Sequence, residues 1–103
     1  MITATKTTLA AATWTLVGDY SADSQGRPKG VRVRHISSGV SDYIEIVIGG
    51  ATAPAGGVLG DRIPTSEAAE FFDTVDGGGS GAIDYVWAKC ASICDVLVTP
   101  FIR

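Results

Sequence analysis

Apolar and polar residues alternate along three segments of the chain, which are residues 42–50, 82–90 and 94–101. The apolar positions are rich in β-branched and aromatic side chains, and glycine or proline borders the segments instead of helical sequence. Alternation with a period of two is typical of a strand that buries one face. The pattern therefore predicts an all-β fold, a small antiparallel β-sandwich or jelly-roll-like single domain with an extended N-terminal arm.

Three earlier stretches alternate in the same way. In residues 13–17 the apolar side chains are those of Trp14 and Leu16. Residues 31–37 divide their side chains between two faces, Val31, Val33 and His35 on one and Arg32, Arg34 and Ile36 on the other. Residues 43–48 form the next predicted strand, and we expect its isoleucine face in the core, namely Ile44, Ile46 and Ile48.

Residues 62–75 are compatible with either a helix or a strand. Pro64-Thr65-Ser66-Glu67 could open a helix with apolar residues at helical spacing, and residues 70–75 could equally be the centre of a strand. We favour the strand because its neighbours are strands and the glycine run 77–81 would end it as a hairpin loop. Residues 83–89 and 95–99 are predicted to form the final hairpin, which Pro100 ends because proline has no amide hydrogen to donate.

The segments between and before these strands differ in character. Residues 1–12 are rich in threonine and alanine, so we expect an extended arm that is loose or pairs with another surface. The β-sandwich domain then covers residues 13–103. Residues 18–30 form a polar loop, Ser38-Gly39 a turn, and residues 49–60 a loop apolar enough to pack against a neighbour or over the sandwich edge.

Composition points to one domain with a thin core. A chain of 103 residues can bury a two-layer core, but alanine makes up much of its 46% hydrophobic share. Thin cores often depend on contacts with other subunits. We therefore expect a homo-oligomer, a trimer rather than a dimer.

The net charge of −3 is mild but unevenly distributed. The first third is basic, with Lys6, Arg27, Lys29, Arg32 and Arg34, whereas acidic residues predominate after residue 41. We favour two solvated faces of one sandwich, since exposed charges contribute little energy. The alternative is a head-to-tail contact between two copies, or with a different partner, steered by the opposite charges.

The sequence contains no recognisable set of catalytic or metal-ligating residues. Cys90 and Cys94 lie four apart, and the single histidine, His35, is remote from them in sequence. A disulfide across the turn is possible, but no secretion signal is visible in the first six residues, so we favour reduced, part-buried thiols. His35 has no nucleophile motif near it, so we expect a structural histidine, no enzyme activity, no metal and no cofactor.

Nucleic acid and membrane partners are also not expected. The basic residues 27–35 include no aromatic side chain for base stacking, and the chain as a whole is acidic. No segment approaches the ~18 consecutive apolar residues that a membrane span requires.

The candidate interface residues are large or charged side chains on the predicted strands. Trp14 and Trp87 are favoured as a core pair, with an interface anchor as the alternative. Arg32 and Arg34 would meet acidic residues of an adjacent strand or subunit. Tyr85, Trp87 and Lys89 share one face of their strand and are a candidate contact surface.

Several pieces of the chain resemble a group of small bacteriophage virion proteins. The matching pieces are Trp14-Thr15-Leu16-Val17, residues 48–54, Tyr85-Val86-Trp87-Ala88-Lys89 and Val96-Leu97-Val98-Thr99-Pro100. The polar loop 18–30 departs from the pattern of that group. The resemblance implies a β-sandwich or jelly roll that decorates (cements) a capsid, or forms the base of a head fibre or spike.

The function that follows from this resemblance is that of a virion structural protein. It would assemble in the host cytoplasm and bind the major capsid protein, or another virion protein, as a homo-oligomer whose arm adds a strand to a neighbour. The alternative is a carbohydrate- or receptor-recognition module of a phage fibre or tail, with Tyr85 and Trp87 beside Asp84 as its platform.

Overall fold

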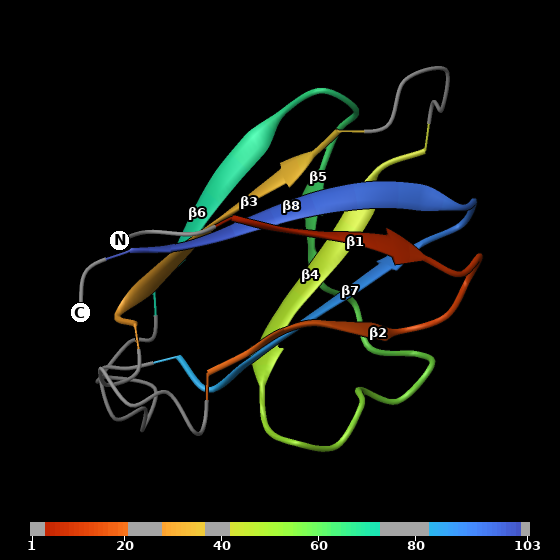
Figure 1. The fold of residues 1–103 in the computed structure, drawn as a ribbon. Helices are drawn as coiled ribbons and strands as arrows, with labels where there is room; N and C mark the ends of the chain where they lie inside the picture. Colours follow the sequence, from red (N-terminus) through yellow and green to blue (C-terminus); the bar gives the residue numbers. More distant parts are fainter. Residues whose placement is uncertain (1–3, 21–27, 37–41, 73–82, 102–103) are drawn as a thin grey trace.

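The computed structural model describes residues 4–20, 28–36, 42–72 and 83–101, which form eight strands in two layers (Figure 1). The strands are β1 (Thr5–Leu9), β2 (Thr15–Asp19), β3 (Gly30–His35), β4 (Ile44–Gly49), β5 (Asp61–Ile63), β6 (Ala68–Phe72), β7 (Tyr85–Cys90) and β8 (Cys94–Phe101). Sheet A has the order β1-β8-β3-β6 and sheet B the order β2-β7-β4-β5, and every neighbouring pair is antiparallel. The predicted all-β antiparallel sandwich is confirmed.

The core lies between the two sheets and follows the alternation of the sequence. In β3 the side chains of Val31, Val33 and His35 share the buried face, in agreement with the predicted division into two faces, while Arg32 and Arg34 are exposed. β8 alternates strictly between buried and half-buried residues over its eight positions. From sheet B the isoleucines of β4 and β5 complete the core, which contains Ile44, Ile46 and Ile63.

The stretch 62–72 contains strands and a turn, so the strand alternative is confirmed and the helix is wrong for these residues. β6 pairs with β3 from Gly30↔Phe72 to Arg34↔Ala68. A turn at residues 65–66 precedes it, held by hydrogen bonds that the amide of Ser66 donates to His35 and the amide of His35 donates to Glu67. The predicted positions 73–75 and the glycine run 77–81 lie outside the described residues.

β2 buries a different face from the predicted one. Leu16 is 37% exposed, whereas Val17 is only 4% exposed. The pairing with β7 shifts between Leu16 and Gly18, which marks a β-bulge. Val17 is the extra residue of this bulge and is buried, whereas Leu16 precedes it and lies opposite Trp87.

The predicted final hairpin is wrong, since its two strands lie in different sheets. β7 is central in sheet B, and β8 is central in sheet A. The connecting residues 91–93 cross from one layer to the other.

Pro100 also does not end its strand, because it pairs with Val31 of β3. Among the described residues, the register of β1 along β8 ends at Val98, so within them Pro100 has a strand partner on one side, where proline is tolerated.

Part of the expected N-terminal arm forms a strand of the sheet. β1 pairs along β8 from Thr5↔Val98 to Leu9↔Cys94, and the Leu9 side chain is fully buried. This differs from the expected loose segment, because the threonine-rich stretch has a partner strand within its own chain. The division between residues 12 and 13 stays a prediction. The predicted turn at Ser38-Gly39 and most of the loop 18–30 lie outside the described residues.

Candidate functional site

A disulfide joins the two layers where the chain crosses between them. Cys90 ends β7 and Cys94 begins β8, their Cα atoms are 6.5 Å apart, and both side chains are buried. The expectation of reduced thiols was therefore wrong. It rested on the lack of a visible secretion signal, whereas the crossing at residues 91–93 brings both buried side chains together between the sheets.

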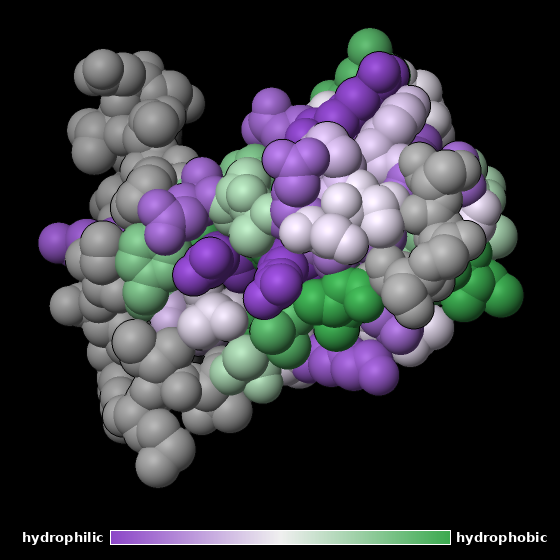
Figure 2. All heavy atoms as spheres, turned by 90° about the horizontal axis from the view of Figure 1, so that it is seen from above, coloured by the Kyte–Doolittle hydropathy of each residue, from purple (hydrophilic) through white to green (hydrophobic). Residues whose placement is uncertain are grey.

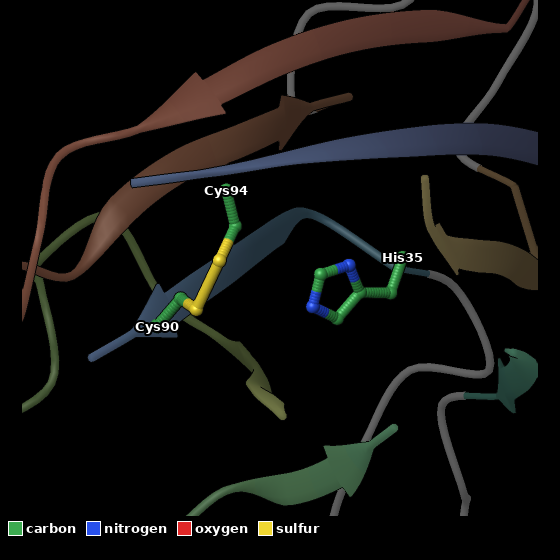
Figure 3. A group of neighbouring side chains, drawn as sticks. All are labelled: His35, Cys90 and Cys94. Atoms are coloured by element: carbon green, nitrogen blue, oxygen red, sulfur yellow. A yellow bond between two sulfur atoms is a disulfide. The ribbon is translucent and has the colours of Figure 1, made fainter. Parts of the chain in front are cut away.

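His35 lies directly beside this disulfide (Figure 3). One imidazole nitrogen and the two sulfur atoms all lie within 4.8 Å of one another. The sequence separates His35 from Cys90 by more than half the chain, but β3 pairs with β8 up to His35↔Val96. Pairing of β3 with β8 therefore brings His35 close to Cys94, and the disulfide adds Cys90 from the other sheet.

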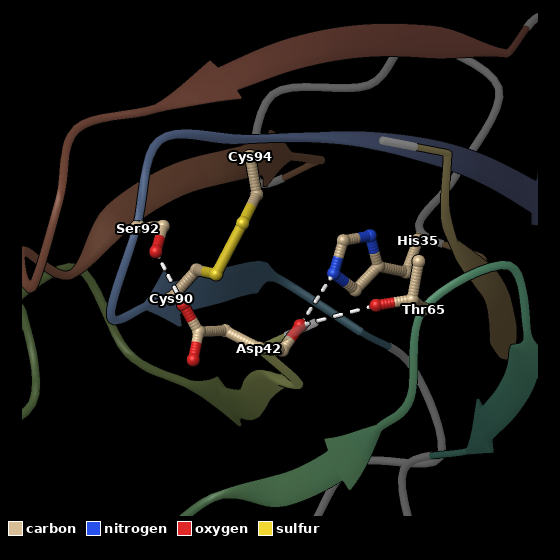
Figure 4. The surroundings of a disulfide bond; sticks show 6 residues. All are labelled: His35, Asp42, Thr65, Cys90, Ser92 and Cys94. Atoms are coloured by element: carbon tan, nitrogen blue, oxygen red, sulfur yellow. Dashed lines mark hydrogen bonds between the residues drawn. A yellow bond between two sulfur atoms is a disulfide. The ribbon is translucent and has the colours of Figure 1, made fainter. Parts of the chain in front are cut away.

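The backbone of Asp42 holds the imidazole in place (Figure 4). Nε2 of His35 lies 2.9 Å from the Asp42 carbonyl oxygen, which also accepts a bond from Thr65 Oγ1 at 3.4 Å. The Asp42 carboxylate accepts a hydrogen bond from Ser92 Oγ. Because a carbonyl oxygen can only accept, we assign the proton to Nε2, which leaves a lone pair on Nδ1. This buried Nδ1 has no hydrogen-bond partner among the described residues.

A second polar cluster occupies the outer face of sheet B. Glu45 of β4 is only 6% exposed, and its carboxylate lies 3.6 Å from Lys89 Nζ and 3.9 Å from Arg62 Nε. Each cation also contacts an aromatic ring, Lys89 that of Trp14 at 5.0 Å and Arg62 that of Tyr43 at 4.3 Å.

The loop 50–60, which was expected to pack against a neighbour or over the sandwich edge, lies beside this cluster on the outer face of sheet B. The Trp87 indole donates to the Gly50 carbonyl at 2.9 Å, and Lys89 donates to the Gly56 carbonyl at 3.3 Å. Between the loop and the sheet lies a hollow of about 390 Å³. At its rim Leu59 is 78% exposed and Tyr43 is 41% exposed.

The predicted interface residues separate into two groups on opposite faces. Trp14 and Lys89 meet on the outer face of sheet B, beside Tyr85 and Trp87 of β7. Trp87 is 9% exposed and capped by the loop, so it offers no open platform with Tyr85. Arg32 and Arg34 line a small hollow on the outer face of sheet A together with Leu97 and Thr99. Their role as interface residues stays a prediction.

The edges of sheet A are the features that sequence reasoning missed. β1 and β6 are its outer strands, five residues each, and both carry charges on the outer face. Lys6 of β1 lies opposite Leu97, and Glu70 of β6 lies opposite Arg32. Which strand lies at an edge depends on pairing across the whole chain, so no local signal in the sequence identified these two.

The comparisons with known proteins give one structural similarity. No family model matches the sequence, and no curated protein does either. A chain from a solved structure of Bacillus endospore appendages, described as a novel family of disulfide-linked pili, is similar with a TM-score of 0.46 at 17% identity. The similarity covers 99% of this chain and 89% of that chain.

This finding corrects the expected phage origin. The similar structure is a pilus subunit and not a phage protein, so the resemblance to bacteriophage virion proteins was wrong. The capsid-decoration function, the capsid partner, the virion location and the alternative role in a phage fibre or tail are withdrawn with it. Most of the pieces that suggested the resemblance, such as Val96-Leu97-Val98-Thr99-Pro100 in β8, belong to strands of the sandwich, and unrelated sandwiches share that pattern.

Proposed function

We propose that this chain is a non-enzymatic structural subunit that polymerises through the edges of sheet A. The observation that supports this most directly is the direction of its outer strands. Each neighbour in the order β1-β8-β3-β6 is antiparallel, so β1 and β6 run in opposite directions. A second copy in the same orientation would place its β1 antiparallel beside the first copy's β6.

The contact is heterologous, because β1 of one copy meets β6 of another. Such contacts leave a free edge at each end and so generate an open filament when the rotation does not close a ring. The outer strands of sheet B, β2 and β5, likewise run in opposite directions. β1 and β2 contact each other, so they lie at the same side of the sandwich. Stacking along this direction would advance each copy by about 19 Å, from four strands at ~4.8 Å.

The charges of the two edges complement each other. β1 carries Lys6, and β6 carries Glu70. The exposed Glu67 lies immediately before β6. Lys6 and Glu70 both lie on the outer face of sheet A, so they would approach each other across the contact. The edges of sheet B are protected against pairing, since β2 has a bulge and β5 is three residues long.

The distribution of hydrophilic and hydrophobic side chains on the surface agrees with assembly through strand edges. Figure 2 shows purple hydrophilic side chains between separate green patches, rather than one continuous apolar area, on the coloured part of this face. An edge-to-edge contact uses backbone hydrogen bonds and needs no large apolar patch.

The disulfide suggests that the subunit works in an oxidising environment outside the reducing cytoplasm. The part of the chain that the structure describes includes no helix long and apolar enough to cross a membrane.

The test compares assembly of the oxidised chain with that of charge variants. Light scattering after size exclusion, together with negative-stain electron microscopy, should show filaments that grow with concentration. Lys6→Glu and Glu70→Lys should each weaken assembly, because each places like charges at the contact. The double variant Lys6→Glu/Glu70→Lys should restore it. Lys29→Glu is the matched control, since Lys29 is exposed but lies outside both edges.

Three results would contradict the proposal. One is a chain that stays monomeric at every concentration tested. Another is a closed trimer whose mass is unchanged by any of the charge variants, which would favour the trimer expected from the thin core. Equal loss of assembly in the control and the edge variants would show a non-specific effect of net charge and would also count against it.

A further inference from the structure

We propose that the reduced chain binds one divalent thiophilic cation such as Zn²⁺ between His35, Cys90 and Cys94, in the place that the disulfide occupies when oxidised. The three side chains come from β3, β7 and β8, and all three are buried. Imidazole and thiolate are the ligands that zinc prefers in proteins.

The spacing of the ligand atoms fits such an ion after a small movement. The imidazole nitrogen and both sulfur atoms already lie within 4.8 Å of one another. Ligand atoms about 2.3 Å from a tetrahedral ion are ~3.8 Å apart, so the nitrogen and sulfurs would approach by about 1 Å at most. The sulfurs themselves would separate from bonding distance, and the Cα distance of 6.5 Å leaves room for this.

Charge decides which class of cation the site would take. Two thiolates and a neutral imidazole carry −2, so a divalent ion gives a neutral complex and a monovalent ion leaves −1. An uncompensated charge is costly in this interior, because both cysteines belong to the same buried apolar cluster as Val33, Val96 and Val98. The site therefore favours a divalent over a monovalent soft cation.

The protons and electrons of the exchange balance as follows. A thiol or phosphine reductant supplies two electrons, which with two protons convert the disulfide into two thiols while the reductant is oxidised. The cation then displaces both thiol protons, which leave to solvent. If Nε2 is the ligand, its proton moves to Nδ1, which has a lone pair and no hydrogen-bond partner among the described residues. The Asp42 carbonyl oxygen, 2.9 Å from Nε2, lies beside the site.

The experiment uses the full chain, reduced with a phosphine and titrated with Co²⁺ as a spectroscopic probe. We expect one equivalent to bind, with thiolate-to-cobalt charge-transfer absorption and the strong visible bands of a tetrahedral ion. Zn²⁺ should displace it. The oxidised chain should show neither set of bands, because its sulfurs are bonded to each other. His35→Gln should weaken binding at least about tenfold, since one of three protein ligands is lost.

Thermal melting separates binding in the folded chain from binding to an unfolded one. Zn²⁺ should raise the melting temperature of the reduced chain and leave that of reduced His35→Gln much less changed. If the reduced chain is unfolded, Zn²⁺ should restore the circular dichroism spectrum of the oxidised protein. Absence of cobalt bands, equal affinity in His35→Gln, or binding without any gain in melting temperature or structure would each overturn the proposal. None of these results depends on polymerisation through β1 and β6.

Discussion

Reducing the disulfide in the presence of a chelator should destabilise the fold only modestly. The bond links two sheets, so a large loss is intuitive. However, in the chain-entropy account a disulfide acts by restricting the unfolded chain, and the effect grows with the length of the closed loop. Cys90 and Cys94 are separated by only four positions, so the closed loop is very short.

The expected loss can be worked out from that loop. About five residues give a chain entropy near −7 cal/mol/K, which is about 2 kcal/mol at 25 °C. For a domain near 100 residues, 2 kcal/mol corresponds to a fall of about 8–16 °C in the melting temperature. Reduction removes no heavy atom from the core, so no cavity adds to this loss. The sheets remain held together by the core between them, which includes Val31, Ile44 and Val96.

Denaturant and thermal unfolding of the oxidised and reduced chain, followed by circular dichroism with the chelator present, measure this difference. The double variant Cys90→Ala/Cys94→Ala is the comparison, and it should lose more, because it also removes buried atoms. A loss above about 5 kcal/mol on reduction would refute the reasoning, since the bond would then act as a clamp between the sheets and not as a short-loop constraint. A loss below about 0.5 kcal/mol would refute it from the other side.

Three further changes test other parts of the structure by the free energy of unfolding. Glu45→Gln should lower the free energy of unfolding by about 1–3 kcal/mol, between the values for surface and fully buried ion pairs. In a Lys89→Met background the same substitution should lower it by less, and an equal loss there would contradict the ion pair. Gly60→Ala should cost about 1–3 kcal/mol, because its Cβ would lie 2.7 Å from the Ile46 carbonyl oxygen; a neutral result would contradict this close approach. Trp87→Phe should cost about 1 kcal/mol and speed proteolysis of the loop 50–60, since the indole hydrogen bond to that loop is lost; unchanged cleavage would show that the bond does not hold the loop.

Much of the fold could be predicted because its central strands alternate strictly. β3 and β8 each bury every second residue, and that pattern is a local property of the sequence. Which strands pair is not local, and for that reason the hairpin of residues 83–89 and 95–99 was wrong. The bulge in β2 was missed for a related reason, because the shift between Leu16 and Gly18 exists only relative to β7.

The candidate sites were less predictable, because each depends on contacts between distant segments. His35 meets Cys90 and Cys94 only through the pairing of β3 with β8. Alternation indicated the isoleucine face of β4 as the core face, but the burial of Glu45 on the other face depends on distant segments, among them Arg62, Lys89 and the loop 50–60. The thiols were assigned as reduced because the first residues of the chain show no secretion signal, an inference about location that did not consider where the side chains meet.

The place of the disulfide separates the stability of the subunit from that of the proposed polymer. The bond lies in the interior at the crossing from β7 to β8, while the assembly edges are β1 and β6. Pairing of those edges buries backbone groups outside the core and leaves the cysteines untouched. Reduction should therefore lower the melting temperature of the subunit while filaments persist at temperatures where the reduced subunit is still folded. If filaments instead dissolved on reduction below that temperature, covalent links between copies would be carrying the assembly, and strand pairing alone would not explain it.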